Sequence, residues 1–218
     1  MTVVAIDGQA GAGKSTVAAA LAERLGLAHV DTGAYYRAAT LAVLRAGVDV
    51  ADERACARIV ADARIGREGG RTLLDGEDVE DEIRGPAVTA AVSTVAAHRG
   101  VRAALLDLQR QAVTAPGAVV EGRDAGTVVV PEAEVKVWLT AGPERRAERR
   151  AAQLGAPDAD TVSAHAADLA RRDAEDAARM APAPDAIVVD TTQRSVESLV
   201  DELAARVRAA GALHGAVE

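Results

Sequence analysis

The sequence predicts an α/β protein in which a mostly parallel, five-stranded sheet is flanked by helices. Short apolar runs rich in β-branched residues alternate along the chain with stretches that carry apolar residues at helical spacing. The composition is 49% apolar over 218 residues, which is enough for one sizeable core. Open sheets of this class bind ligands at the carboxyl ends of their strands, so we expect the functional residues to follow the strands directly.

The first expected strand, residues 3–6, runs into Gly8-Gln-Ala-Gly-Ala-Gly-Lys14-Ser15, a full match to G-x-x-x-x-G-K-[ST]. The glycines allow the backbone to fold closely around a phosphate, and the helix that follows presents its N-terminus to the anion. In this interpretation Lys14 reaches the β and γ oxygens and the Ser15 hydroxyl holds magnesium. The alternative is a glycine-rich turn without a ligand, which leaves the lysine and the hydroxyl unexplained.

The remaining elements continue the alternation. Strands are expected at 28–30, 118–121, 135–139 and 186–190. Helices are expected at 14–25, from about 34 to 47, at 52–62, 86–97 and 99–113, from about 143, after 161, and from Ser195, which can cap the last one. Gly26 is expected to end the first helix.

Residues 63–74 interrupt this pattern with two short strands joined at Gly69-Gly70, a turn pair that tolerates positive φ. We expect a hairpin inserted into the α/β chain. The next segment, 75–84, carries six carboxylates among ten residues. A metal site is one interpretation, but so regular an acidic spread favours a solvated loop.

Composition limits the possible partners. The formal charge of −8 argues against a protein that coats nucleic acid with a broad basic face, and three aromatic residues provide few surfaces for base stacking. The single cysteine, Cys56, excludes an intramolecular disulfide and a Cys-rich zinc site, which suits a reducing compartment. The chain shows neither a leader pattern nor an apolar run of about twenty residues. We therefore expect a cytoplasmic protein without a membrane segment.

Two classes of nucleotide enzyme compete at this point. A GTPase switch needs an Asn-Lys-x-Asp segment, which is missing because neither of the two lysines fits it. A kinase for a phosphorylated acceptor needs several arginines to neutralise two sets of phosphates, and the segments near the carboxyl edge supply Arg37, Arg102, Arg123, Arg149, Arg172 and Arg179. A nucleotide-dependent interaction module is the non-enzymatic alternative.

Four motifs together resemble bacterial cytidylate kinase over residues 2–208. They are Asp31-Thr-Gly-Ala-Tyr-Tyr-Arg37, Leu74-Asp-Gly-Glu-Asp-Val79 with Glu82-Ile-Arg84, Glu121-Gly-Arg-Asp-Ala-Gly-Thr-Val-Val129, and Arg172-Asp-x-x-Asp-x-x-Arg179. The resemblance implies a three-layer α/β/α P-loop fold in a single kinase domain. Its core would cover about 1–36, 99–149 and 173–210, with a nucleoside-monophosphate-binding insert at about 37–98 and a mobile lid at about 150–172.

The implied reaction is the transfer of the γ-phosphoryl group of ATP to CMP or dCMP by a monomer that uses Mg²⁺. Another P-loop kinase, for a small molecule or for UMP, is the alternative within the enzyme class. The resemblance implies that the ATP-binding residues are Gly8, Gly11, Ala12, Gly13, Lys14, Ser15 and Thr16, with Ser15 at the metal. The implied CMP-binding residues are Thr32, Arg37, Ser93, Arg102, Arg123, Asp124, Asp176 and Arg179, and the catalytic ones are Lys14, Arg123, Arg149 and Arg172.

The chemistry of these residues agrees with the implied roles. Cytosine presents a donor at N4, which suits the carboxylate of Asp124, whereas uracil presents an oxygen there that the carboxylate repels. Arg102 can donate to the cytosine acceptors, and Asp176 can accept from ribose hydroxyls. The sequence departs from the family pattern at Glu121, where aspartate is common, and at Glu175, which lies near a family arginine, so neither residue is given a role here.

Overall fold

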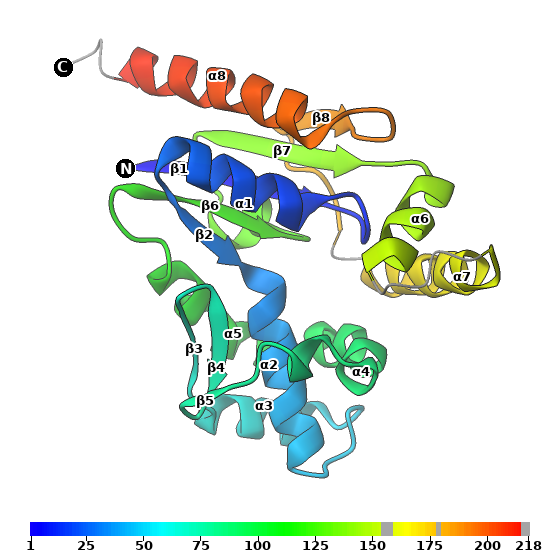
Figure 1. Cartoon of the computed structure of the whole chain (residues 1–218). Helices are drawn as coiled ribbons and strands as arrows, with labels where there is room; N and C mark the ends of the chain where they lie inside the picture. Colours follow the sequence, from blue (N-terminus) through cyan, green and yellow to red (C-terminus); the bar gives the residue numbers. More distant parts are fainter. Residues whose placement is uncertain (154–158, 178–179, 215–218) are drawn as a thin grey trace. The chain divides into compact units, whose positions relative to one another are not determined.

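The computed structural model describes residues 1–153, 159–177 and 180–214, and its helices and strands are labelled in Figure 1. The chain forms two compact units. The first comprises Met1–Val30 together with Val113–Glu218, and the second comprises Asp31–Ala112. In the described part of the chain, no helix combines the length and the apolar composition that crossing a membrane would require.

The first unit contains the predicted five-stranded sheet. Its strands are β1 (Thr2–Gly8), β2 (Ala28–Asp31), β6 (Gly117–Gly122), β7 (Val135–Thr140) and β8 (Ile187–Asp190), in the order β2-β6-β1-β7-β8. β1 runs parallel to both β6 and β7, and β7 runs parallel to β8 (Figure 1). The predicted α/β class with a parallel sheet is therefore confirmed. Asp7 lies opposite Gly122, so β1 and β6 end together and deliver the residues that follow them to one edge.

Two helices build the core on this sheet. α1 (Lys14–Leu25) packs against β6 and against α8 (Val196–His214), and the cluster includes Leu21, Val119 and Leu203, none of which is exposed. Gly26 ends α1 in the left-handed conformation at φ 67°, as expected. The backbone N–H of Ser198 donates to Ser195 Oγ at 3.2 Å, which confirms Ser195 as the cap of the last helix.

Two further helices, α6 (Pro143–Gln153) and α7 (Ala159–Asp176), pack against each other in the first unit (Figure 1). They form a small apolar cluster in which Ala147 and Leu169 contact Ala10 of the glycine-rich loop. A five-residue π-helix, Ala125–Val129, follows β6 and packs on β1. The sequence pattern did not predict this π-helix.

The second unit is helical with a small antiparallel sheet. Its helices are α2 (Thr32–Arg45), α3 (Glu53–Asp62), α4 (Pro86–Ala97), α5 (Arg99–Gln111) and the short 3₁₀ helix η1 (Glu82–Arg84). The strands β3 (Ile65–Glu68) and β4 (Arg71–Leu74) form the predicted hairpin, with Gly69 and Gly70 both at positive φ. A third strand, β5 (Glu77–Asp78), pairs with β4.

Five of the six carboxylates of the acidic segment are exposed, as the solvated interpretation expects, but the segment is not an irregular loop. It contains β5 and η1, and its carboxylates pair with arginines of the same unit. Glu77 and Glu82 bind Arg45, while Asp78 and Asp81 bind Arg71.

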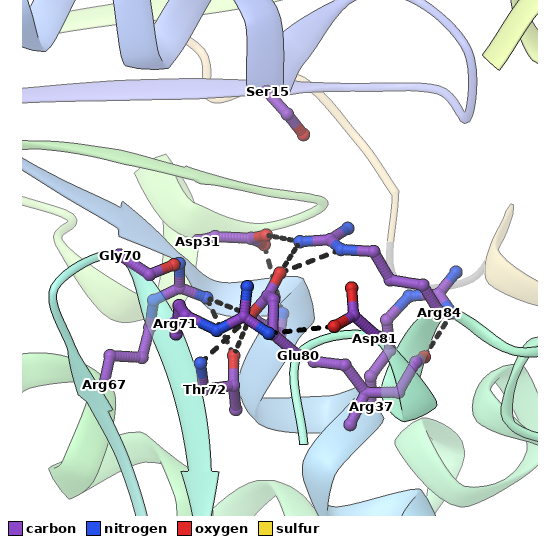
Figure 2. A network of polar contacts seen from close by, with 12 residues as sticks. Ser15, Asp31, Arg37, Arg67, Gly70, Arg71, Thr72, Glu80, Asp81 and Arg84 are labelled. Carbon is purple, nitrogen blue, oxygen red and sulfur yellow. Dashed lines mark hydrogen bonds and ion pairs between the residues drawn. The ribbon is translucent and has the colours of Figure 1, made fainter. Parts of the chain in front are cut away.

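Glu80 is the most enclosed carboxylate of the acidic segment, with a side chain that is 13% exposed. It accepts hydrogen bonds from the backbone and hydroxyl of Thr72, at 3.0 and 2.6 Å, and from Arg84 (Figure 2). For this one carboxylate the partners are threonine and arginine rather than the water that the acidic pattern suggests.

Candidate active site

The glycine-rich loop connects β1 to α1 at the carboxyl edge of the sheet. Gly8, Gly11 and Gly13 have φ values of 146°, 75° and 94°, which side chains disfavour. A Cβ at Gly8 would lie 2.1 Å from the Leu139 carbonyl oxygen, so only glycine lets the loop pass β7. Gly13 caps α1 in the left-handed conformation, and the first residues of the helix are Lys14 and Ser15. The loop thus has the strand–loop–helix context that its motif requires.

The lysine and the serine of the loop each have a defined partner. Lys14 Nζ donates to the Gln9 carbonyl oxygen at 2.9 Å, across the loop itself. Ser15 Oγ donates to Glu121 Oε2 at 2.8 Å. Glu121 lies near the end of β6 opposite Ile6 of β1, is 2% exposed, and has its other oxygen 2.9 Å from His29 Nε2. Three residues from different elements therefore form a continuous chain of hydrogen bonds, His29–Glu121–Ser15.

Asp7, the last side chain before the loop, holds the π-helix in place. Its two oxygens accept hydrogen bonds from the backbone N–H groups of Ala125 and Gly126, both at 2.7 Å. Burial raises the pKa of the Asp7 carboxyl, and the two backbone hydrogen bonds oppose that rise. The residue therefore fixes the segment that follows Asp124. The sequence analysis did not predict a role for Asp7, although a carboxylate at the end of an otherwise apolar strand is a signal that could have identified it.

Arg123 connects β6 to the loop and to α7. Its Nη1 donates to the Gly8 carbonyl oxygen at 3.0 Å, and its Nη2 lies 3.3 Å from Asp176 Oδ2. Burial lowers the pKa of Arg123, and the attraction of Asp176 opposes this effect. The structure thus brings together two of the predicted CMP-binding residues. Asp124, next in the chain, is 6% exposed.

Arg149 on α6 reaches the other side of the loop. Its guanidinium donates to the Ala12 carbonyl oxygen at 3.3 Å and to Thr191 Oγ1 and O at 2.9 and 2.7 Å. Thr191 Oγ1 also donates to the Ala12 carbonyl oxygen, at 2.9 Å. The buried Thr191, which the sequence did not single out, therefore ties the segment after β8 to the loop.

A pocket of about 670 Å³ lies beside these contacts in the first unit. It is formed by the first turns of α6, with Gly142 before them, and by the connection from β8 to α8. Its lining consists of residues 142–145, Glu148 and residues 192–195. Gly142 N donates to Thr192 Oγ1 at 2.9 Å, which holds the two segments together.

Two charged residues that the sequence did not single out also contact the loop. Arg146 of α6 and Asp173 of α7 form an ion pair, and both bind the Ala10 peptide. Arg172, a predicted catalytic residue, precedes Asp173, and its Nε is buried without a hydrogen-bond partner among the described residues. The predicted CMP-binding residue Arg179 lies outside the described residues.

The second unit holds the other predicted CMP-binding residues on three helices that pack together. Thr32 and Arg37 lie on α2, which is capped by Asp31 through a 3.1 Å bond from Ala34 N. Arg37 Nη1 donates to the Ile83 carbonyl oxygen and to Thr89 Oγ1 at 2.9 and 3.1 Å. Ser93 is buried on α4, and the Arg102 guanidinium lies 5.6 Å from the ring centre of Tyr36.

Arg84 adds a further cation to this unit. Figure 2 shows its guanidinium between Asp31 and Glu80, with Nη2 3.7 Å from Asp31 Oδ2 and 2.5 Å from Glu80 Oε1. The carboxylate of Asp31, which caps α2, therefore lies next to Arg84, and Arg84 is in turn held by the half-buried Glu80.

A complete phosphate loop at the carboxyl end of a central parallel strand, followed by its helix, defines a P-loop nucleotide-binding protein. A family model described as cytidylate kinase matches residues 4–209. The cytidylate kinase of Mycolicibacterium paratuberculosis is 50% identical over 94% of this chain and 95% of its own length. The cytidylate kinase of Pelotomaculum thermopropionicum is 47% identical over 94% of this chain and 96% of its own length. That of Rhodococcus opacus is 48% identical over 92% of this chain and 92% of its own length. The chain belongs to the cytidylate kinase family.

Proposed function

We propose that this protein transfers the γ-phosphoryl group of ATP to CMP or dCMP, giving ADP and CDP or dCDP. The observation that carries the proposal is the intact phosphate loop, with Lys14 at its end and Ser15 bound to the buried Glu121, in a chain of this family. The curated relatives, which are named cytidylate kinases, support the choice of acceptor.

ATP binds through its phosphates to the loop residues Gly8 to Thr16, where the backbone amides and the N-terminus of α1 receive the negative charge. Lys14 exchanges the Gln9 carbonyl for a phosphate oxygen. The donor atoms near the loop suit Mg²⁺, because the Ser15 hydroxyl is a hard oxygen ligand. The Glu121 carboxylate accepts a hydrogen bond from this hydroxyl. Ser15 would hold the ion, which supplies positive charge to the phosphate oxygens. The pocket formed by the first turns of α6 and the β8–α8 connection suits the nucleoside of the donor, since Arg149 and Thr191 connect it to the loop.

The residues proposed to bind the acceptor come from two parts of the chain. The second unit contributes Thr32, Arg37, Ser93 and Arg102, which supply hydroxyls and positive charge for a phosphate and a base. The first contributes Arg123, Asp124, Asp176 and, from outside the described residues, Arg179. Asp124 accepts from the N4 amino group of cytosine, and Asp176 accepts from the sugar hydroxyls. Arg37 and Ser93 lie in the proposed insert at about 37–98, which thus serves the acceptor.

The reaction needs no general base, because the second pKa of a phosphate monoester is about 6 and the acceptor is mostly dianionic at neutral pH. The enzyme has to align two anions that repel each other and to neutralise the charge that spreads over the transferring group. Lys14, Arg123, Arg149 and Arg172 serve this role. The proposed lid at about 150–172, of which residues 154–158 lie outside the described residues, would exclude water, which would otherwise accept the phosphoryl group.

The proposal is tested by measuring ADP formation from ATP with CMP, dCMP, UMP, AMP, dTMP and shikimate as separate acceptors. CMP and dCMP should give rates far above that of ATP alone. Turnover of UMP, AMP or shikimate without turnover of CMP would assign the chain to another kinase activity. ATP binding without acceptor-dependent turnover would indicate a nucleotide-dependent interaction module instead. Both substrates are cytoplasmic metabolites, so we expect a cytoplasmic enzyme. We also expect a monomer, which light scattering should show.

A further inference from the structure

The peptide group of Ala10 is held from both sides by two charged residues of the helix pair α6–α7. Ala10 N donates to Asp173 Oδ1 at 3.4 Å, and the Ala10 carbonyl oxygen accepts from Arg146 Nη1 at 3.2 Å. The same Arg146 nitrogen donates to Asp173 Oδ2, which closes the ring. The contact is enclosed, since Arg146 is 7% exposed and the Asp173 side chain is 12% exposed. We call these two residues the Ala10 clamp.

The loop is shaped to accept the clamp. A Cβ at Gly11 would lie 3.0 Å from both Cβ and the carbonyl oxygen of Arg146, so the close approach of α6 requires glycine there. The Ala10 side chain packs against Ala147 and Leu169, one from each helix. Because apolar contacts and charged hydrogen bonds converge on one residue of the phosphate loop, the loop cannot change its backbone at Ala10 without affecting α6 and α7.

Residues proposed to bind or act on substrate flank the clamp on α7. Arg172 precedes Asp173, and Asp176 lies three residues further on, where it pairs with Arg123. Arg123 in turn donates to the Gly8 carbonyl oxygen and lies 4.0 Å from Asp173. The end of α7 is therefore joined to the phosphate loop at Ala10 by the clamp and at Gly8 through Arg123.

We propose that Arg146 and Asp173 are positioning residues that couple ATP binding at the phosphate loop to CMP binding through α7. This inference rests on the proposed function. Phosphates that order the loop also fix the Ala10 peptide, which fixes Asp173 and, through the helix, Arg172 and Asp176. CMP then binds to residues that the ATP phosphates have already ordered, so the affinity of the protein for CMP rises.

The coupling is measured by titrating CMP calorimetrically into the full chain, alone and with a saturating magnesium complex of a non-hydrolysable ATP analogue. The wild type should bind CMP at least about fivefold more tightly with the analogue. Asp173→Asn keeps the size of the side chain but loses the charge that holds Arg146, and it should reduce this ratio to within about twofold of one. Arg146→Lys should act in the same direction, because a single ammonium cannot reproduce the guanidinium geometry.

Arg171→Ala is the matched control. Arg171 lies on the same helix but is exposed and pairs only locally with Asp168 and Glu175 among the described contacts. This variant should keep the wild-type ratio. Hydrogen exchange gives a second readout, since the analogue should slow exchange over residues 159–177 in the wild type and in Arg171→Ala but not in the clamp variants.

The outcomes separate this inference from the proposed function. A wild type that phosphorylates CMP but shows the same CMP affinity with and without the analogue would overturn the coupling and leave the reaction intact. A wild-type ratio in folded Asp173→Asn and Arg146→Lys would also overturn it. A wild type that neither binds nor phosphorylates CMP would instead remove the proposed function on which the inference depends.

Discussion

The Ser15 hydroxyl donates to Glu121 Oε2 at 2.8 Å and so connects the phosphate loop to the adjacent strand β6. Because Ser15 donates its hydroxyl hydrogen bond to Glu121, the lone pairs of Ser15 Oγ are left to face a cation. His29 Nε2 lies 2.9 Å from the other carboxylate oxygen and fixes its orientation. Hydrogen bonds of this kind, made to a metal ligand from outside the metal site, orient that ligand. We therefore propose that Glu121, which was given no role in the sequence analysis, orients Ser15 for the proposed magnesium site.

Glu121→Gln tests this assignment. An amide can turn its NH₂ group toward Ser15 and reverse the hydrogen bond, so the Mg²⁺ concentration at half-maximal rate should rise about tenfold. The measurement is the initial rate at fixed ATP over a range of free Mg²⁺. Glu197→Gln, which changes an exposed residue of α8, is the control and should leave the Mg²⁺ dependence unaltered. Equal Mg²⁺ dependence in both variants would exclude a role for Glu121 at the metal.

Lys14→Ala should reduce the rate of phosphoryl transfer at least about 100-fold, because it removes the cation that the loop presents to the phosphates. The fold should be kept, since Lys14 is partly exposed and contacts the loop backbone rather than the core. Turnover and the thermal unfolding midpoint are measured on the same preparations. Lys136 is the only other lysine and pairs with Asp185 away from the loop, so Lys136→Ala should stay active. Near-wild-type transfer in Lys14→Ala would remove the loop from the mechanism.

Asp124→Asn should weaken the preference for CMP over UMP by about tenfold in kcat/KM. The amide can donate to the uracil oxygen that a carboxylate repels, and one such base contact is worth about 1–3 kcal/mol. Competition between CMP and UMP in one reaction measures the ratio. Asp107→Asn removes the same charge from an exposed position on α5 and serves as the control. If the ratio does not change in Asp124→Asn, the base is read by other residues.

Glu80→Gln should destabilise the protein at neutral pH and reduce the pH dependence of its stability. Burial alone would raise the pKa of Glu80, but hydrogen bonds from Thr72 and Arg84 hold it below the ordinary 4.5. A carboxyl with a lowered folded-state pKa stabilises the fold above its unfolded-state pKa and loses that contribution as the pH falls. The cost at pH 7 should be about 1–3 kcal/mol.

Urea unfolding at several pH values between about 3 and 7 measures this effect. The wild type should lose stability toward acid more steeply than Glu80→Gln. Asp62→Asn, at the exposed end of α3, removes a carboxylate without these partners and should follow the wild-type curve. Parallel curves for the wild type and Glu80→Gln would mean that the ionisation of Glu80 contributes nothing to the pH dependence of stability.

The local elements were predictable because their signals lie within a few residues. The loop motif, Gly26 at the end of α1 and Ser195 at the start of α8 depend on spacing and capping, and the structure confirms all three. The hairpin at 65–74 was predictable for the same reason. The strand β5 was not, because a two-residue strand pairs through its backbone and leaves only an acidic pattern in the sequence.

The polar contacts of the site were not predictable, because each joins residues far apart in the chain. Asp7 binds Ala125 and Gly126 only because β1 and β6 pair in parallel, and that register is a property of the folded sheet. Arg146 is one of four arginines in a short helix, and only the packing of α6 against the loop selects it. The charge pattern identified an arginine-rich helix but not the arginine that binds Ala10.

The central claim, phosphoryl transfer from ATP to CMP, is tested most directly by following labelled γ-phosphate from ATP in an equimolar mixture of CMP, dCMP, UMP, AMP and shikimate. Chromatography of the products identifies the acceptor within one reaction, with Lys14→Ala as the background. We predict that the label enters CDP and dCDP first and that the Lys14→Ala reaction shows neither. Label that enters another acceptor while CMP is left unchanged, or that appears only as free phosphate, would contradict the proposed function.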